Sequence, residues 1–142
     1  MIRLIYVSQA RRDLTESDLQ AILATSRRTN QALGITGILT YHPHGFMQCL
    51  EGEREAVEKI YARILCDSRH TEVKTLTYDT IDKRLFPLWA MAYVGLDDVT
   101  SREILRRHRL GGAAVPHYVS PEEVLEIVQE FSENVTRLVE LW

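Results

Sequence analysis

The sequence predicts an α+β domain in which two helices cover one face of a sheet, followed by a two-helix extension. Two observations support this prediction: β-branched and aromatic runs alternate with stretches of helical spacing, and they follow the order β-α-β-β-α-β-β. The length of 142 residues suits one domain, and 45% hydrophobic and 26% charged residues are typical of a globular protein. We expect an antiparallel or mixed sheet within residues 1–97 and the extension over residues 98–142.

The first strand is expected over residues 2–8, which form a β-branched and aromatic run. Thr15 should cap the helix that follows, because a threonine hydroxyl accepts a hydrogen bond from the free N–H groups at a helix start. We expect this helix to fray near residues 29–30, because Gly34 lies just beyond and glycine commonly ends helices.

Two further strands, over residues 35–41 and 46–50, are expected to form a hairpin, because the segment HPHG at 42–45 has turn chemistry. A second helix should follow Gly52, where apolar residues recur at helical spacing. The last two strands are expected over residues 73–81 and 85–94.

The pattern changes to helices after Asp97. A short basic helix should end at Gly111-Gly112, and Ser120 should cap a longer helix that has Pro121 at its first position. The longer helix carries a wide apolar face, made of Val124, Ile127, Val128, Phe131, Val135, Leu138 and Leu141. Such a face is too apolar to remain in water, so we expect the extension to pack on the sheet or on a partner chain.

Charge and composition exclude several classes of protein. The chain has 17 Lys+Arg against 20 Asp+Glu and a net charge of −3, which argues against a general nucleic-acid binder, because phosphate neutralisation needs a surplus of cations. No apolar run approaches the roughly 20 residues that cross a bilayer, and the start MIRLIYVSQ lacks the order of a signal peptide. We expect a cytoplasmic protein that binds neither nucleic acid nor membranes.

Three polar residues occupy positions that a plain core does not explain. Gln48 is expected to point inward, where its amide must find both donors and acceptors, although a satisfied structural glutamine is the commoner case. Tyr6 has a simpler interpretation as a packed strand tyrosine, and Asn30 as a helix C-cap. Trp89 and Met91 are expected to share one strand face as core residues.

The sequence gives little support for a metal site, a catalytic nucleophile or a nucleotide-binding loop. His42, His44 and Cys49 lack the paired spacing of zinc ligands, and Pro43 separates the two histidines. The sequence contains no GxSxG, Walker or GxGxxG motif. On spacing alone the sequence predicts a small α+β binding domain.

Five segments together resemble the BLUF family of blue-light sensors that use flavin adenine dinucleotide (FAD). In chain order they are LIYVSQ at 4–9, SRRTNQALGITGILTY at 26–41, FMQCLEG at 46–52, RILCDSRH at 63–70 and FPLWAMAYV at 86–94. The resemblance extends over residues 1–97, and the tail is similar to that of short, stand-alone BLUF photoreceptors. It implies a ferredoxin-like sheet, FAD held non-covalently between the two helices, and a sensor without enzymatic turnover.

The resemblance also implies roles for individual residues. Light would move an electron and a proton from Tyr6 to the flavin through Gln48, and recombination would leave Gln48 donating to the flavin carbonyl and shift the absorption to the red. Further contacts to FAD are expected from Ile22, Asn30, Arg63, Ile64, Asp67, Arg69 and His70. Trp89 and Met91 would carry the signal outwards, and which of them faces the flavin is left open. Thr29 stands where relatives often have His or Asn.

The output is expected to reach a separate downstream signalling protein, since no effector domain is recognised. Apolar residues near the C-terminus also predict a homo-oligomer; they are Leu138, Val139, Leu141 and Trp142. Two alternatives remain open: a small flavin-dependent reductase, which would turn over a nicotinamide, and a light-insensitive regulatory module of the same fold.

Overall fold

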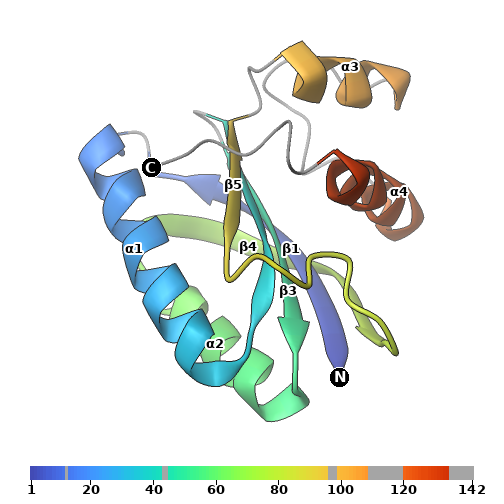
Figure 1. Ribbon diagram of the computed structural model, residues 1–142. Coiled ribbons are helices and arrows are strands. Elements are labelled where there is room, and N and C mark those ends of the chain that lie inside the picture. The colour runs from blue at the N-terminus through green and yellow to red at the C-terminus, as the bar shows by residue number, and fades with distance from the viewer. Residues whose placement is uncertain (12, 43–44, 96–98, 109–119, 135–142) are drawn as a thin grey trace.

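In the part of the chain that the structure describes, a five-stranded mixed sheet carries a pair of helices on each face (Figure 1). The computed structural model describes residues 1–11, 13–42, 45–95, 99–108 and 120–134. In chain order the elements are β1 Ile2–Ala10, α1 Glu16–Leu33, β2 Thr36–His42, β3 Gly45–Gly52, α2 Arg54–Leu65, β4 His70–Thr80, β5 Ala92–Gly95, α3 Val99–Arg107 and α4 Pro121–Glu133. The predicted element order is confirmed.

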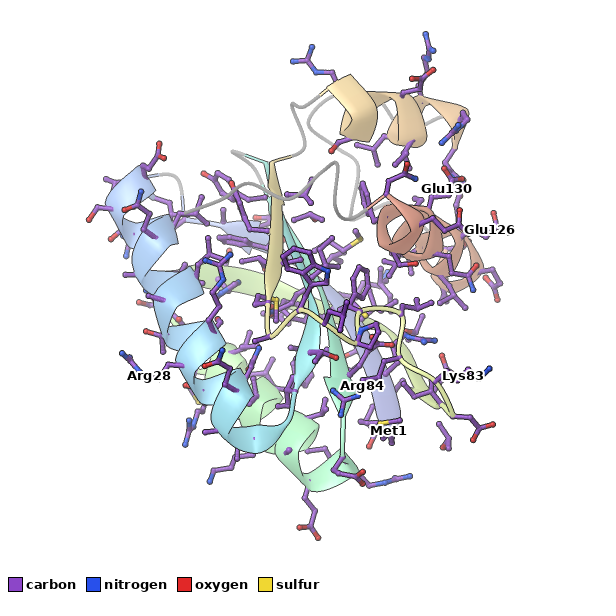
Figure 2. All side chains as sticks on the ribbon, viewed as in Figure 1. Met1, Arg28, Lys83, Arg84, Glu126 and Glu130 are labelled. Carbon is purple, nitrogen blue, oxygen red and sulfur yellow. The ribbon has the colours of Figure 1, made fainter. Side chains whose placement is uncertain are left out.

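The strands lie in the order β4-β1-β3-β2-β5. All neighbouring strands pair antiparallel except β2 and β5, which run parallel. Helices α1 and α2 lie on one face, and α3 and α4 lie on the other (Figure 1). Side chains fill the space on both sides of the sheet (Figure 2), so the molecule has two hydrophobic cores.

Helix α1 has well-defined ends. Thr15 forms a capping box with Asp18, as each side chain bonds the backbone N–H of the other, so the predicted N-cap is confirmed. The predicted fraying near residues 29–30 is wrong. Gly34 adopts a left-handed conformation with φ 68°, which lets its N–H and that of Ile35 bond the carbonyl of Asn30. Asn30 therefore lies inside the helix and is not its C-cap.

The hairpin of β2 and β3 needs a glycine where the strands approach closely. A Cβ atom at Gly37 would lie 1.8 Å from the carbonyl oxygen of Cys49, so no side chain fits there. The hairpin pairing runs out to His42 and Gly45, and the predicted turn residues 43–44 lie outside the described part of the chain.

The predicted strand over residues 85–94 is wrong for residues 85–91, because only Ala92–Gly95 pairs with the sheet. The N–H groups of Leu85 and Phe86 instead donate to the buried carboxylate of Glu51, each at 2.9 Å. Glu51 is also paired with Arg3 at 2.8 Å. These N–H groups therefore bond a side chain instead of a neighbouring strand, and Pro87 has no backbone N–H with which to pair.

This loop places its two expected output residues on opposite sides of the sheet. Met91 belongs to the core under α1 and α2, whereas Trp89 packs against the core under α3 and α4. The prediction that Trp89 and Met91 share one strand face is therefore wrong, because the loop does not follow strand alternation.

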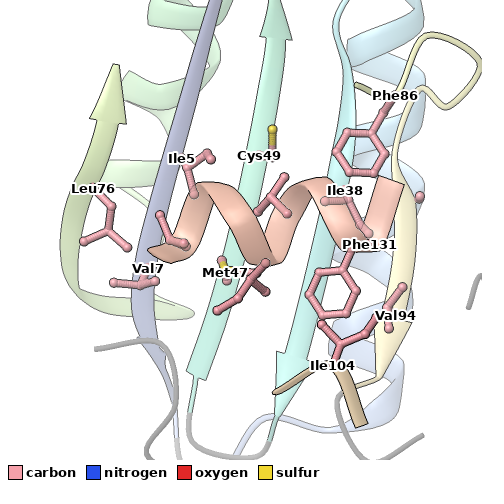
Figure 3. Packing of buried hydrophobic residues seen from close by; sticks show 14 of the residues in the cluster. Ile5, Val7, Ile38, Met47, Cys49, Leu76, Phe86, Val94, Ile104 and Phe131 are labelled. Carbon is pink, nitrogen blue, oxygen red and sulfur yellow. The ribbon is translucent and has the colours of Figure 1, made fainter. Parts of the chain in front are cut away.

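Helix α4 runs across the strands and closes the second core (Figure 3). Its buried residues are Val124, Ile127, Val128 and Phe131, as the apolar pattern predicts, and Ser120 caps the helix by accepting from Glu123 N–H. The described part of the extension thus packs on the sheet. Four further predictions lie outside the described residues: the boundary at 97/98, the helix end at 111–112, the continuation of the apolar face at 135, 138 and 141, and the apolar terminus.

Candidate functional site

A cleft opens between α1 and α2, lined by residues of both helices and of the sheet. Its floor is the sheet, represented by Leu39 of β2 and Gln48 of β3. The wall from α1 contains Ile22, Thr25, Ser26, Thr29 and Asn30, and the wall from α2 contains Ile60, Arg63 and Ile64. One side is closed by Asp67 and Arg69, from the segment that joins α2 to β4, and by His70, the first residue of β4.

A tyrosine and a glutamine meet beneath the cleft floor. Tyr6 of β1 is directly opposite Gln48 of β3 in the antiparallel register, so both side chains leave the same face of the sheet. The Tyr6 hydroxyl donates to Gln48 Oε1 at 2.5 Å. Burial, as the largest cause, raises the pKa of Tyr6 well above its usual value. The phenol therefore keeps its proton at neutral pH.

The other end of the Gln48 amide faces a thioether. Gln48 Nε2 donates to the sulfur of Met91 at 3.4 Å, and both residues are buried. The amide is thus held between a hydroxyl donor and a weak sulfur acceptor, so exchanging its two ends would reverse both contacts. Met91 belongs to the core on the face of α1 and α2, whereas Trp89 packs against the core on the other face.

Asn30 has one satisfied and one unsatisfied end. Its Nδ2 donates to the carbonyl of Ala90 at 2.8 Å, whereas its Oδ1 is buried and has no partner among the described residues. Buried polar atoms almost always have a hydrogen-bond partner. Since Asn30 lines the cleft, this free acceptor indicates a ligand that carries a hydrogen-bond donor.

Asp67 and Arg69 form a bidentate pair beside the cleft. Arg69 Nη2 lies 2.6 Å and Nε 2.9 Å from Asp67 oxygens, and the Arg69 N–H also bonds the carboxylate. These hydrogen bonds are the main reason that the pKa of Asp67 is lowered and that of Arg69 raised. Both groups are therefore charged at neutral pH, and with Arg63 they give this side of the cleft a polar lining.

His70 connects the polar side to the aromatic core. Its Nδ1 lies 3.0 Å from Ser8 Oγ, and its ring lies 4.6 Å from that of Phe46 and 6.2 Å from that of Tyr6, between centroids. Burial is the main cause that lowers the pKa of His70 to about 4. At neutral pH it is an uncharged group in the wall of the cleft.

A family model covers residues 1–92, and its family is described as BLUF, sensors of blue light using FAD. The chain belongs to the BLUF family. Photoactivated adenylate cyclase subunit beta is 43% identical over 84 residues in Euglena longa and 42% identical over 84 residues in Euglena gracilis. Each alignment covers 59% of this chain and 10% of the relative, so the chain spans about a tenth of the length of these relatives.

Solved BLUF structures share the fold. BlsA in its photo-activated state has a TM-score of 0.86 and 29% identity, and the match covers 99% of both chains. BlrB in its dark state has a TM-score of 0.78 and 32% identity, over 94% of this chain and 96% of BlrB. A bacterial light-regulated adenylyl cyclase has a TM-score of 0.68 and 30% identity, over 99% of this chain and 40% of the cyclase. The ferredoxin-like α+β fold is thereby confirmed.

As a BLUF protein, the chain is a blue-light sensor module whose cofactor is FAD, and this module is not an enzyme. The cleft fits such a cofactor, because isoleucines from two helices suit a flat aromatic ring and the free Asn30 Oδ1 suits a ring-edge donor. In the described part of the BLUF chain no three His, Cys, Asp or Glu side chains gather as metal ligands. Nor is any described helix long and apolar enough to cross a membrane.

The BLUF cleft brings together the residues singled out in the sequence. Eight of them line it: Ile22, Asn30, Gln48, Arg63, Ile64, Asp67, Arg69 and His70. Tyr6 is not one of the lining residues, but its hydroxyl donates to Gln48, which is. Four further lining residues were not predicted from the sequence: Thr25, Ser26, Leu39 and Ile60. Helical spacing from Ile22, Asn30 and Ile64 identifies three of these, because residues three or four apart share a helix face; Leu39 follows only from its pairing with Gln48.

Proposed function

We propose that the protein is a photoreceptor in which Tyr6 and Gln48 form the light-driven switch. The observation that carries this proposal is the buried Tyr6–Gln48–Met91 series at the cleft floor, with contacts of 2.5 and 3.4 Å. Bound FAD supplies the absorption of blue light and an acceptor for one electron. Tyr6 is protonated at rest, so it can release an electron together with its hydroxyl proton, and the proton leaves along the hydrogen bond to Gln48.

Gln48 is the group whose hydrogen bonds differ before and after the light-driven transfer. When the electron and proton return to Tyr6, the Gln48 amide is left with donor and acceptor ends exchanged, by rotation or by a tautomer change. The site is buried, where an unmade hydrogen bond costs about 1–3 kcal/mol, so each arrangement is held by its own set of partners. The amide presented to the cofactor then changes, and the absorption moves to the red.

Further residues would hold FAD by their chemistry. Ile22 and Ile64 would enclose the ring from the two helices, and Asn30 would accept from the ring edge. Asp67 and Arg69 would bind its polar side, and Arg63 and His70 would flank it. The support is their shared position on the cleft walls.

The signal would leave through the loop before β5. Met91 contacts Gln48 on one side of the sheet, and Trp89 packs on the core of α3 and α4 on the other, with only Ala90 between them. A change at Gln48 therefore has a short route to the C-terminal helices. We propose that these helices act on a separate signalling protein, in the cytoplasm, with the chain in a homo-oligomer. Cross-linking in cells, compared between light and dark, would test for the signalling partner, and light scattering of the purified protein would test for the homo-oligomer.

The decisive experiment is an absorption spectrum of protein purified in dim red light, taken before and after a blue pulse. We expect flavin bands that shift to the red and relax in the dark, with the shift lost in Tyr6→Phe and Gln48→Leu while flavin stays bound. Tyr41→Phe is the matched control, since the tilted Tyr41 ring contacts Phe46 and, among the described residues, its hydroxyl makes no hydrogen bond to Gln48. An undiminished shift in either switch variant contradicts the mechanism. Turnover of NADH would favour a reductase, and a fixed spectrum would favour a light-insensitive module.

A further inference from the structure

Arg27 of α1 reaches the backbone of the loop that precedes β5. Its Nε donates to the carbonyl oxygen of Met91 at 3.1 Å. The side chain is partly buried, and this burial lowers the pKa of Arg27. No carboxylate among the residues that the structure describes lies within 4.0 Å of it. A partly desolvated guanidinium without an ionic partner is costly, so its bond to one carbonyl suggests a specific role.

The neighbouring carbonyls of the loop are fixed in the same way. Asn30 lies three residues after Arg27, on the same face of α1, and its Nδ2 donates to the carbonyl of Ala90 at 2.8 Å. The N–H of Gly37 donates to the carbonyl of Trp89 at 3.0 Å. Three successive carbonyls are thus each held by a different donor, and the one that belongs to Met91 depends on Arg27.

Met91 needs such an anchor to make its contact. A methionine side chain has three rotatable bonds and its sulfur is a weak acceptor, so the 3.4 Å contact with Gln48 Nε2 cannot fix the side chain by itself. The backbone position decides whether the sulfur reaches the amide. Arg27 therefore acts on Gln48 indirectly, through the backbone and side chain of Met91.

We propose that Arg27 is a positioning residue for the switch: by holding the Met91 carbonyl, it keeps the Met91 sulfur on Gln48 Nε2 and so directs Gln48 Oε1 to Tyr6. The effect on the light response rests on the proposed function. The effect on the resting orientation of the amide does not, because it concerns only residues of this chain.

Arg27→Gln and Arg28→Gln form a matched pair of variants. Arg28 is the next residue of the same helix, is exposed, and points away from the sheet (Figure 2). Both changes remove one positive charge from α1. Arg27→Lys is a milder variant, which keeps the charge and loses the planar guanidinium, in case Arg27→Gln folds poorly.

The first measurement is nuclear magnetic resonance of FAD-bound protein in the dark, with labelled methionine methyl groups and glutamine side-chain amides. We expect the Met91 methyl and Gln48 amide signals to move in Arg27→Gln and Arg27→Lys, and to stay in place in Arg28→Gln. Met47, buried in the other core, is the internal reference and should not move in any variant. Unmoved Met91 and Gln48 signals in both Arg27 variants would overturn the proposal, whether or not the protein responds to light.

The second measurement is the rate at which the blue-light spectral shift decays in the dark. Loss of one contact that favours the resting amide should slow this recovery by about threefold or more in Arg27→Gln, the size expected for one weak hydrogen bond. In a Met91→Leu background the same change should have no further effect, because Arg27 then has no sulfur to position. An undiminished effect in that background would show that Arg27 acts by another route. If the wild-type spectrum does not respond to light, the proposed function fails while the magnetic resonance result still decides the positioning role.

Discussion

At the scale of single residues, His70 makes the stability of the protein depend on pH. Its pKa is lowered from 6.5 to about 4, chiefly by burial. Between these values the unfolded chain binds a proton that the folded chain does not, so the free energy of unfolding is full above pH 6.5 and falls as the pH drops towards 4. The loss attributable to His70 should approach about 3 kcal/mol.

Urea unfolding of the wild type and His70→Gln, at several pH values across this window, checks the prediction. Carboxylates also titrate there, but they are common to both proteins, so the difference between the two curves isolates His70. The wild type should lose more stability than the variant on acidification. Parallel curves would show that His70 is protonated as readily in the folded protein as in the unfolded one.

At the scale of elements, the sequence predicts whatever depends on local signals. The Thr15 side chain caps the start of α1, and alternation along β1 places Tyr6 on the face of α1 and α2, whereas the predicted end of α1 near residues 29–30 falls short of Gly34. The loop over residues 85–91 was missed because its N–H groups bond Glu51, about 35 positions earlier in the chain. The same holds for the site. Its helical walls are predictable from helix spacing in the sequence, whereas the Met91–Gln48 contact depends on tertiary structure.

Glu51 should accordingly be essential for the loop. Glu51→Gln removes the charge that pairs with the buried Arg3 and offers an NH₂ group to the N–H donors of Leu85 and Phe86. Breaking a buried ion pair from one side typically costs about 3–5 kcal/mol, and we expect a loss of that size in the free energy of unfolding. Chemical denaturation measures it.

Glu53→Gln is the control for the loss of one acidic charge. Glu53 is exposed and makes no side-chain cap bond at the start of α2, so its replacement should change stability by less than about 0.5 kcal/mol. Equal effects of the two substitutions would mean that Glu51 contributes nothing specific. A faster amide hydrogen exchange at Leu85 and Phe86 in Glu51→Gln alone would locate the effect in the loop.

At the scale of the whole molecule, α4 determines whether the second face of the sheet is closed within one chain. Phe131 is fully buried against the core that includes Ile38 and Val94 (Figure 3). Phe131→Ala removes this packing and leaves a cavity, so the free energy of unfolding should fall by about 3–5 kcal/mol. Gln129→Ala, on the exposed side of the same helix, should cost little.

Protein concentration distinguishes packing within a chain from packing between copies. If α4 covers its own sheet, the loss caused by Phe131→Ala is the same at every concentration, because no association is involved. We expect equal losses in unfolding experiments over roughly a hundredfold range of protein concentration. A loss that shrinks at high concentration would place α4 on a neighbouring copy, and the route from Trp89 to the C-terminal helices would then cross between subunits.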